Sequence, residues 1–508
     1  MTAEKTKLTG APRRVTTLSA LFVCGFLGLF FVDAQLFAAA VDRSFGWSAQ
    51  YFGLFWQLLM VANFAVALFV ATRPYARARL GDRDSPEFPA FQWIAMVLCT
   101  LLAGGGVFWA AAEPVAHFVS VPPLFSHITS GTAEAVPFAL AQSFLHWGFL
   151  AWSILGSLTA VVLMRLHYDH GLPLAPRTLL YPLLGEKGVR GPVGDVADVV
   201  SILAVFAGTV GPIGFLGLQI SYGLSDLYGT ADTTTIQLVT IAGLMLIYLT
   251  SAVSGMHRGI QILSRANLIL GGALLLFLLL AGPTWFIFES FLSGLFSHLQ
   301  WFGEQALHRG EAGWFDDPGW LAYWTIFFWG WFIGYGPMMA IFIARISRGR
   351  SAREIIVLMS VVAPILTMAW FSILGGTGLG LEIAEPGTIT QPFEGFNLPA
   401  VLLAITQAMP LNAVISFLFL VLTALFVATT GDSMTYSLSV VSAGHDNPPR
   451  SLRIFWGVTL GITAMVLVGG PEGGVGKLQN FIVVTAVPVS LLLLPSLWGV
   501  FPLLRRAE

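Results

Sequence analysis

The sequence predicts an all-α polytopic membrane protein with twelve transmembrane helices, and three observations carry this prediction. Of the 508 residues, 56% are hydrophobic and only 10% are charged, at a mean hydropathy of +0.79. A soluble chain of this length could not cover so much apolar surface with so few charges. Apolar runs of about 20 residues, long enough to cross roughly 30 Å of hydrocarbon, recur along the whole chain. Their hydrophobicity is continuous rather than alternating, which favours helices over the strands of a barrel.

The predicted spans are separated by polar or helix-breaking stretches. They occupy Thr17–Ala39, Tyr51–Ala71, Gln92–Ala112, Glu134–Met164, Val196–Gly223, Thr234–Thr250, Ile260–Leu280, Trp320–Arg345, Arg353–Gly376, Ala413–Ser442, Leu452–Gly470 and Lys477–Leu504. Two shorter apolar segments, Trp285–Trp301 and Leu398–Met409, are interpreted as an interfacial helix and a short, partly buried helix. The first span is too long for a cleavable signal. Both cysteines, Cys24 and Cys99, fall inside spans, so neither a disulfide framework nor a cysteine metal site is expected.

The positions of the basic residues predict the orientation of the chain. If the N-terminus is cytoplasmic, every second connection is cytoplasmic too. All Lys and Arg residues then fall in cytoplasmic segments except Arg43, Arg309 and Lys477. Cytoplasmic segments of membrane proteins are enriched in Lys and Arg, so twelve spans with both termini in the cytoplasm are expected.

Two spans contain helix-breaking residues near their middles. The third contains Gly104–Gly106, and the eighth contains Gly330, Gly334, Gly336 and Pro337. Glycine costs about 1 kcal/mol and proline about 3 kcal/mol in a helix interior. In lipid such breaks persist where the freed backbone groups face a cavity, an ion or a ligand. The two spans lie five apart, which predicts inverted repeats with a binding site near the bilayer midplane. Close helix packing by glycine is the alternative for either cluster alone.

Tryptophans gather in the centres of two spans. Span four contains Trp147 and Trp152, and span eight contains the aromatic stretch Trp329–Pro337. Tryptophan normally lies at the membrane interfaces. A dense group of aromatic faces suits a cation that donates no ordinary hydrogen bonds, such as a quaternary ammonium group. Plain packing is the alternative, because a chain with sixteen tryptophans places some of them in any core.

Two other classes of membrane protein compete with a transporter. A membrane-embedded enzyme would need a polar catalytic constellation at depth. His146 in span four has no clear Cys, Asp or Glu partner and no metal-ligand spacing, so we interpret it as a hydrogen-bonded core residue. A channel would not need two broken helices in inverted repeats. We therefore predict a transporter and no enzymatic activity.

Several stretches, spread along nearly the whole chain, resemble the betaine/carnitine/choline transporter family. They include Phe108–Pro114 at the end of span three, the Trp-Gly-x3-Trp pattern of span four, the tryptophan-rich span eight, and Thr429–Ser433 in span ten. The resemblance implies a LeuT-type core of two inverted five-helix repeats, helices 3–7 and 8–12, preceded by two extra N-terminal helices. It also implies a homotrimer in a bacterial-type inner membrane.

The resemblance divides the chain into six parts. These are a cytoplasmic tail at 1–16, two peripheral helices at 17–90, the first repeat at 91–283, the interfacial helix and its connection at 284–318, the second repeat at 319–504, and a tail at 505–508. Osmotically gated members carry long charged tails, so uptake without tail-based osmosensing is expected.

The resemblance also implies import by alternating access of a small quaternary-ammonium or sulfonium zwitterion, such as betaine, choline or carnitine. The substrate-binding positions that it assigns are Trp147, Trp152, Trp331, Phe332, Tyr335, Gly104 and Gly105. Two positions depart from the family pattern, because Leu155 stands where a tyrosine is usual and Phe332 replaces a tryptophan. Besides this small-molecule substrate and the lipid bilayer, no nucleic-acid partner is expected.

A coupling ion is the one cofactor-like group that the resemblance implies. Thr429 and Thr430 match the hydroxyl ligands of a sodium site in span ten, and Phe426 matches its carbonyl ligand. Threonine in a membrane helix also bonds back to its own turn, which is the structural alternative. Asp432, an acid inside a span, is a second candidate and would carry a proton instead. Exchange of substrate for product, without an ion, is the third alternative.

The topology is testable by cysteine labelling in intact cells. Single cysteines that replace Asp82 and Asp446 should react with a membrane-impermeant maleimide only after the cells are opened. A cysteine that replaces Asp317 should react in intact cells, because its loop is predicted to lie outside. One reversed label would break the twelve-span topology.

Overall fold

The computed structural model describes residues 11–254, 257–310, 319–444 and 448–505, excluding the side-chain surroundings of residue 11 and of residues 99–104 and 254–264. These residues form helices and no strand; a single antiparallel bridge joins Arg79 and Ser351. Ten of the described helical segments are long and apolar enough to cross a membrane, or eleven if one bent pair is a span. The prediction of an all-α polytopic protein is confirmed. The predicted count of twelve spans is not confirmed, because each piece of the third span is too short to be counted as a membrane-crossing helix.

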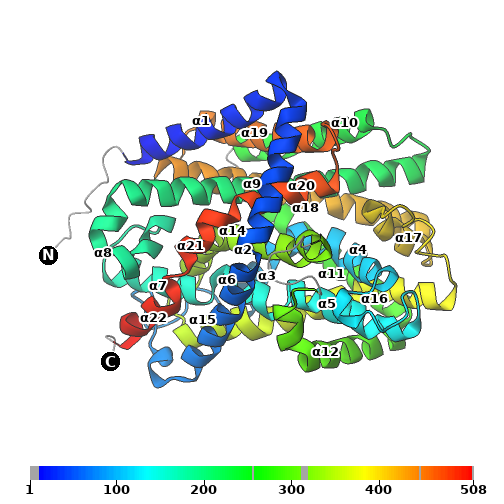
Figure 1. The fold of residues 1–508 in the computed structure, drawn as a ribbon, viewed down its shortest axis with the longest axis horizontal. Coiled ribbons are helices and arrows are strands. Elements are labelled where there is room, and N and C mark those ends of the chain that lie inside the picture. Colours follow the sequence, from blue (N-terminus) through cyan, green and yellow to red (C-terminus); the bar gives the residue numbers. More distant parts are fainter. Residues whose placement is uncertain (1–10, 255–256, 311–318, 445–447, 506–508) are drawn as a thin grey trace.

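The first two helices differ from their predicted bounds. Helix α1 is Ala11–Val32 and α2 is Ala34–Thr72. Asp33 caps α2, accepting a hydrogen bond from the backbone N–H of Leu36 at 2.9 Å, so the helix restarts at once. The predicted connection after Ala39 is therefore wrong, and the 39-residue α2 is roughly 58 Å long. Figure 1 shows α2 running steeply across the direction that α9, α10 and α19 share.

The predicted break in the third span is confirmed. Helix α3 (Ala90–Gly105) ends at the glycine cluster, and α4 (Phe108–Val119) begins after Gly106 and Val107. A short 3-10 turn, η1 (Pro74–Arg77), precedes the span, and η2 (Pro123–Phe125) and η3 (Ala133–Ala135) follow it. The backbone of two residues thus leaves the helical ladder in the middle of a membrane span.

The fourth and fifth spans complete the first part of the buried interior. The fourth consists of α5 (Val136–Trp147), α6 (Phe149–Gly156), α7 (Leu158–Met164) and the π-helical turn η4 (Arg165–Asp169), with Gly148 between α5 and α6. After η5 (Pro176–Leu180) and α8 (Tyr181–Arg190), the fifth span is α9 (Pro192–Tyr228). Both spans are mostly buried against other helices.

The first half ends in two helices and a sharp bend. Helices α10 (Thr234–Ser254) and α11 (His257–Ala281) are followed by α12 (Thr284–Leu307), which bends by 103° from the end of α11. This bend gives α12 the crosswise direction expected of the predicted interfacial helix. At 24 residues α12 is longer than the predicted segment.

The predicted break in the eighth span is wrong. The span begins with α13 (Gly319–Leu321) and a π-helical turn, η6 (Ala322–Ile326), and continues as α14 (Phe327–Ile346), an unbroken α-helix that includes Pro337. Helices α6, α7, α9, α20 and α21 all pack against α14. A helix supported on all sides can lose the one hydrogen bond that a proline removes and still stay helical.

The remaining helices follow the predicted order. The ninth span is α15 (Ala352–Val357), the π-helical turn η7 (Leu358–Val362) and α16 (Ala363–Ala384), and the predicted short helix is η8 (Leu398–Ala400) with α17 (Val401–Gln407). The last three spans are α18 (Asn412–Ala443), α19 (Arg450–Gly469), and a divided one made of α20 (Val475–Val484), α21 (Ala486–Leu493) and α22 (Ser496–Arg505).

Helix packing groups the spans in a way that fits two repeats. Spans three, four, eight and nine pack together through α4, α5, α6, α14 and α16. Spans five, six, ten and eleven pack together through α9, α10, α18 and α19. Each group thus takes two spans from each predicted repeat, at matching positions. The first group lies in the lower half of Figure 1 and the second in the upper half.

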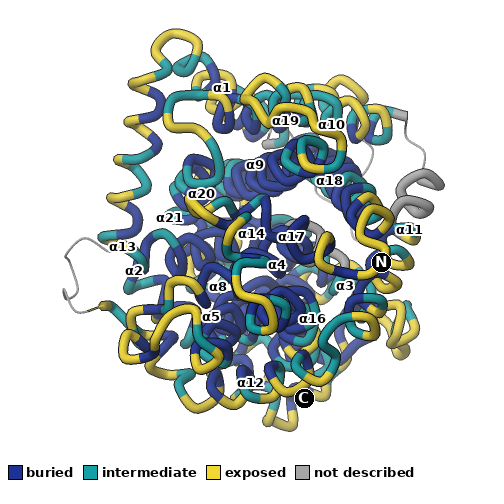
Figure 2. Tube along the Cα trace, turned by 90° about the vertical axis from the view of Figure 1, so that its right-hand side faces the viewer, coloured by how far each residue is buried: buried dark blue, intermediate teal, exposed yellow. Residues whose placement is uncertain are grey.

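Burial differs widely between the spans (Figure 2). In the eighth span, 94% of the most apolar window is buried inside the protein, against 22% in the first span. The sixth span, α10, is also only 22% buried, so this contrast does not by itself distinguish the predicted peripheral helices from the repeats. The contact between the two groups of spans, where α14 packs on α9, lies in the buried middle.

Candidate functional site

Three of the predicted substrate residues come together in the buried middle of the protein. Trp147, at the end of α5, packs its indole edge-to-face on two residues of α14. Its ring centroid lies 5.8 Å from that of Trp331, at 84°, and 5.2 Å from that of Phe332, at 80°. The rings of Trp331 and Phe332 are parallel within 4°. Phe328 and Phe371 also contact Trp147. We name Trp147, Phe328, Trp331, Phe332 and Phe371 the aromatic cluster.

The other two predicted aromatic residues take different places. Tyr335 lies one turn beyond Trp331 on α14, and its hydroxyl shares a hydrogen bond of 2.9 Å with Thr209 on α9. Trp331 donates its indole N–H to the carbonyl of Gly208 at 3.1 Å, so both residues are anchored on α9. Trp152, by contrast, donates its indole N–H to Thr367 Oγ1 at 2.9 Å on α16. No ring contact between Trp152 and the aromatic cluster occurs in the described part of the chain.

The broken third span borders the aromatic cluster directly. A Cβ added to Gly105 would lie 1.9 Å from the ring of Trp147, so only a glycine leaves room for the indole there. The freed carbonyl of the next residue, Gly106, accepts a hydrogen bond from the indole N–H of Trp370 at 2.5 Å. The surroundings of Gly104, the other predicted glycine, lie outside the described residues. The break thus leaves room for the Trp147 ring and frees the Gly106 carbonyl from the helical ladder.

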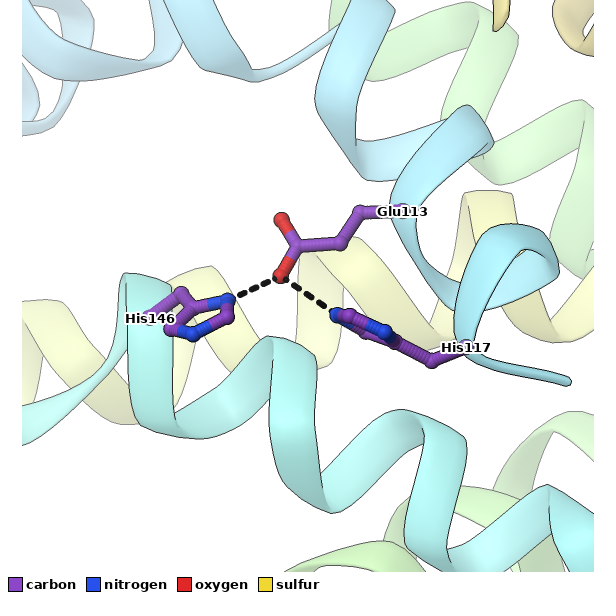
Figure 3. Close-up of side chains that lie close together, drawn as sticks. All are labelled: Glu113, His117 and His146. Atoms are coloured by element: carbon purple, nitrogen blue, oxygen red, sulfur yellow. Dashed lines mark hydrogen bonds and ion pairs between the residues drawn. The ribbon is translucent and has the colours of Figure 1, made fainter. Parts of the chain in front are cut away.

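Glu113, His117 and His146 form a buried polar network (Figure 3), which adjoins the aromatic cluster through Trp147. Glu113, on α4, accepts the indole N–H of Trp147 at Oε2, at 2.6 Å. Its Oε1 lies 2.6 Å from His146 Nδ1 and 3.4 Å from His117 Nε2. The side chains of Glu113, His117 and His146 are fully buried. His146 is a hydrogen-bonded core residue as interpreted, but the prediction that it lacks an acidic partner is wrong.

The far side of His146 is also bonded. Its Nε2 lies 3.0 Å from Gln142 Nε2 on α5 and 3.0 Å from Thr325 Oγ1 on η6. Gln142 and Thr325 also line a small pocket between the loop at 122–124 and Trp320. The irregular turn in span eight therefore lies at η6, beside His146, and not at Pro337. π-helical turns of this kind are common at functional sites.

One carboxylate and two imidazoles close together are residue types that commonly bind a metal ion. The ligand atoms of Glu113, His117 and His146 lie within 4.8 Å of one another. However, both imidazole nitrogens face Glu113 Oε1, and the 2.6 Å separation from His146 is shorter than two ligands of one ion allow. Glu113 Oε1 lies where a metal ion bound by the two histidines would lie. We therefore interpret the arrangement as a hydrogen-bond network.

The predicted ion-coupling residues lie on α18 and face two different helices. Thr429 Oγ1 accepts a hydrogen bond from Asn267 Nδ2, on α11, at 2.9 Å. It also donates back to its own turn, to the carbonyls of Leu425 at 2.9 Å and Phe426 at 3.1 Å, as the structural alternative expects. The Thr430 hydroxyl is a buried polar atom without a hydrogen-bond partner among the described residues. Asp432 instead accepts at Oδ2 from the hydroxyl of Ser251 on α10. Its Oδ1 is likewise buried without a described partner.

Comparison with known proteins decides the family. The model of the betaine/carnitine/choline family of transporters matches residues 14–508. The chain belongs to this family. It is therefore a multi-pass membrane transporter of this family and not an enzyme, as predicted.

Curated members of the betaine/carnitine/choline family are similar over most of their length. Glycine betaine transporter 2 of Vibrio parahaemolyticus is 52% identical over 94% of this chain and 88% of its own. Glycine betaine transporter OpuD of Bacillus subtilis is 33% identical over 93% and 89%. The ectoine/glycine betaine/proline transporter EctP of Corynebacterium glutamicum is 31% identical over 92% and 76%.

Glu113 was not among the site residues predicted from the sequence. The residue was visible as an acid in the apolar stretch Phe108–Pro114, and an ionisable residue inside a span is a functional candidate by default. Phe328, Phe371 and Gly208 were missed for a different reason. Nothing in the spacing of their own segments indicates that they meet Trp147, Trp331 or Tyr335.

The seat of Trp147 can be tested with a matched pair of glycine substitutions. Gly105→Ala should lower the stability of the protein by about 1–3 kcal/mol, the cost of overpacking, because the new methyl displaces the indole. Gly334→Ala, whose methyl would lie 3.5 Å from Ala204, should be neutral or stabilising. Thermal unfolding in detergent measures both. Equal melting temperatures for the two variants would show that Gly105 does not seat Trp147.

Proposed function

We propose that the protein imports glycine betaine, or a closely related zwitterion, by sodium-coupled alternating access. The observation that carries this proposal is the aromatic cluster, in which Trp147, Trp331 and Phe332 present ring faces and edges to one another at the border of a broken span. A trimethylammonium group has a diffuse charge and no N–H to donate. The π-faces of aromatic rings are therefore its best partners in a site from which water is excluded.

The names of the relatives support the same substrate class. Two of the relatives described above are glycine betaine transporters, and the third carries ectoine, glycine betaine and proline by its name. All of these solutes combine a cationic nitrogen with a carboxylate. Phe332 in place of a tryptophan weakens one cation–π face, because tryptophan is the strongest aromatic donor. We therefore place the zwitterion chiefly against Trp147 and Trp331.

Sodium coupling is supported by the oxygen atoms of α18. The Thr429 hydroxyl and the Phe426 carbonyl oxygen lie on the same face of α18, where the hydroxyl donates to that carbonyl at 3.1 Å; a bound cation would replace this hydrogen bond. The unpartnered hydroxyl of Thr430 follows directly in the sequence. Hard, neutral oxygens suit sodium. Helix α3, the first piece of the broken span, packs against α18 and would supply further carbonyl oxygens.

Proton coupling through Asp432 is the second candidate. Its support is the unpartnered Oδ1 of a buried carboxylate inside a membrane span, a group that a proton would neutralise. Asp432 bonds to α10 while Thr429 bonds to α11, so the two mechanisms involve different helices.

We also propose that the transporter is a homotrimer and that both of its termini lie in the cytoplasm.

The substrate site can be tested by alanine substitution. Trp331→Ala, and separately Trp152→Ala, should weaken glycine betaine binding by roughly 1–3 kcal/mol, since a desolvated cation–π contact contributes about 2 kcal/mol. Trp285→Ala is the control, because Trp285 is 80% exposed on α12 and is not part of the aromatic cluster. Radiolabelled uptake in proteoliposomes gives the half-saturating concentrations. Wild-type affinity in the Trp331 variant would reject the site, and wild-type affinity in the Trp152 variant alone would remove Trp152 from it.

The coupling ion can be tested by removing the two hydroxyls. Thr429→Ala/Thr430→Val should raise the sodium concentration for half-maximal uptake more than it raises the glycine betaine requirement, because the ion loses two ligands while the aromatic cluster stays intact. Asp432→Asn serves as the comparison and should leave the sodium requirement unchanged. Uptake driven by a proton gradient without sodium, and abolished in Asp432→Asn, would replace sodium by proton coupling. Full uptake with neither gradient would indicate exchange.

A further inference from the structure

Both pieces of the broken third span hold the same side chain, Trp147. From α3, Gly105 lies against the six-membered ring of the indole, where a Cβ would approach three of its carbons within 2.9 Å. From α4, Glu113 accepts the indole N–H at 2.6 Å. One contact limits where the six-membered ring lies, and the other fixes the direction of the indole N–H. The orientation of Trp147 therefore depends on how α3 and α4 are placed relative to each other.

The protons of this network can be assigned from the chemistry of the partners. The Gln142 amide nitrogen can only donate, so the His146 Nε2 that faces it accepts a hydrogen bond. A neutral His146 then carries its proton on Nδ1 and donates it to Glu113 Oε1. The longer contact from His117 Nε2 reaches the same oxygen. Glu113 thus accepts from two N–H donors, the indole of Trp147 at Oε2 and the Nδ1–H of His146 at Oε1.

We propose that Glu113 is a positioning residue of the substrate site, which acts through Trp147. Its carboxylate fixes the indole N–H on one side, while His146, next to Trp147 in the chain, and His117 hold the carboxylate on the other. The aromatic cluster then presents the Trp147 face toward the substrate without reorientation on binding. This inference rests on the proposed function, because it treats Trp147 as a residue that touches the substrate.

Alternative roles for Glu113 predict different behaviour. A residue that only stabilises the fold would lower the amount of folded transporter and the maximal rate. A ligand of the coupling ion would change the sodium requirement, but the oxygens that support the sodium site lie on α18. A positioning residue changes the substrate requirement alone, and it does so only while the Trp147 N–H is present.

The test is a double-mutant cycle on purified protein in proteoliposomes. In Glu113→Gln one oxygen becomes an amide NH₂, so the single remaining oxygen cannot accept from both Trp147 and His146, and any bond that it keeps to the indole is no longer to a charged group. The hold on Trp147 is therefore weakened. The half-saturating glycine betaine concentration should rise about tenfold or more, as expected for a lost hydrogen bond to a charged group. The maximal rate and the sodium requirement should stay within about twofold of wild type, which is small beside the tenfold change expected in the substrate requirement. In a Trp147→Phe background, which keeps a ring but lacks the N–H, Glu113→Gln should change the substrate requirement by less than about twofold.

Each outcome of the cycle decides a different point. An equal effect of Glu113→Gln in both backgrounds, or no effect in the wild-type background, would overturn the positioning role. If Glu113→Gln does not fold, Glu113→Asp keeps the charge but withdraws the carboxylate by one methylene, and the same two backgrounds are compared with it. A wild-type protein with no saturable glycine betaine uptake would overturn the proposed function and this inference together. Loss of affinity in Trp331→Ala without loss in Glu113→Gln would overturn this inference alone.

Discussion

The break between α3 and α4 is the constraint on which the rest of the site depends. Backbone groups freed inside a membrane have no water to bond, so each must find a partner within the protein. Here the Gly106 carbonyl finds the indole of Trp370. The two helix pieces end on either side of Trp147, one as a glycine that leaves room for the ring and the other through the carboxylate of Glu113.

The eighth span shows how packing can override a local signal. Three glycines and a proline predict a break, yet α14 stays helical through Pro337. This span is among the most buried in the described chain, and the glycines allow other helices to approach closely. For example, a Cβ on Gly336 would lie 2.9 Å from Leu493, and one on Gly330 would lie 3.2 Å from Val483. The glycines of α14 therefore serve packing, the alternative considered for each cluster, while those of span three form a break.

An acid buried in the membrane needs compensation, because removing a carboxylate from water costs several kcal/mol. Glu113 accepts one N–H at each of its two oxygens, from Trp147 and from His146, both at 2.6 Å, and His117 Nε2 lies 3.4 Å from Oε1. Asp432 has only one described donor, and its second oxygen has none. The contrast separates a carboxylate that is fully occupied by the protein from one that retains capacity for a further partner. It agrees with assigning a positioning role to Glu113 and keeping Asp432 as the candidate for a transported proton.

The sequence by itself determined the class of the protein, the approximate position of most spans, the break at Gly105 and the identity of the main aromatic residues. These features depend on hydrophobicity and on the intrinsic preferences of glycine and tryptophan, which act within one segment. The tertiary structure decided that α14 is unbroken and that Trp152 bonds to α16. It also brought Glu113 to His146, 33 positions apart in the chain, and Trp331 to Gly208, 123 positions apart. Contacts between helices depend on how the spans pack against one another, and the periodicity of a single span holds no information about its neighbours.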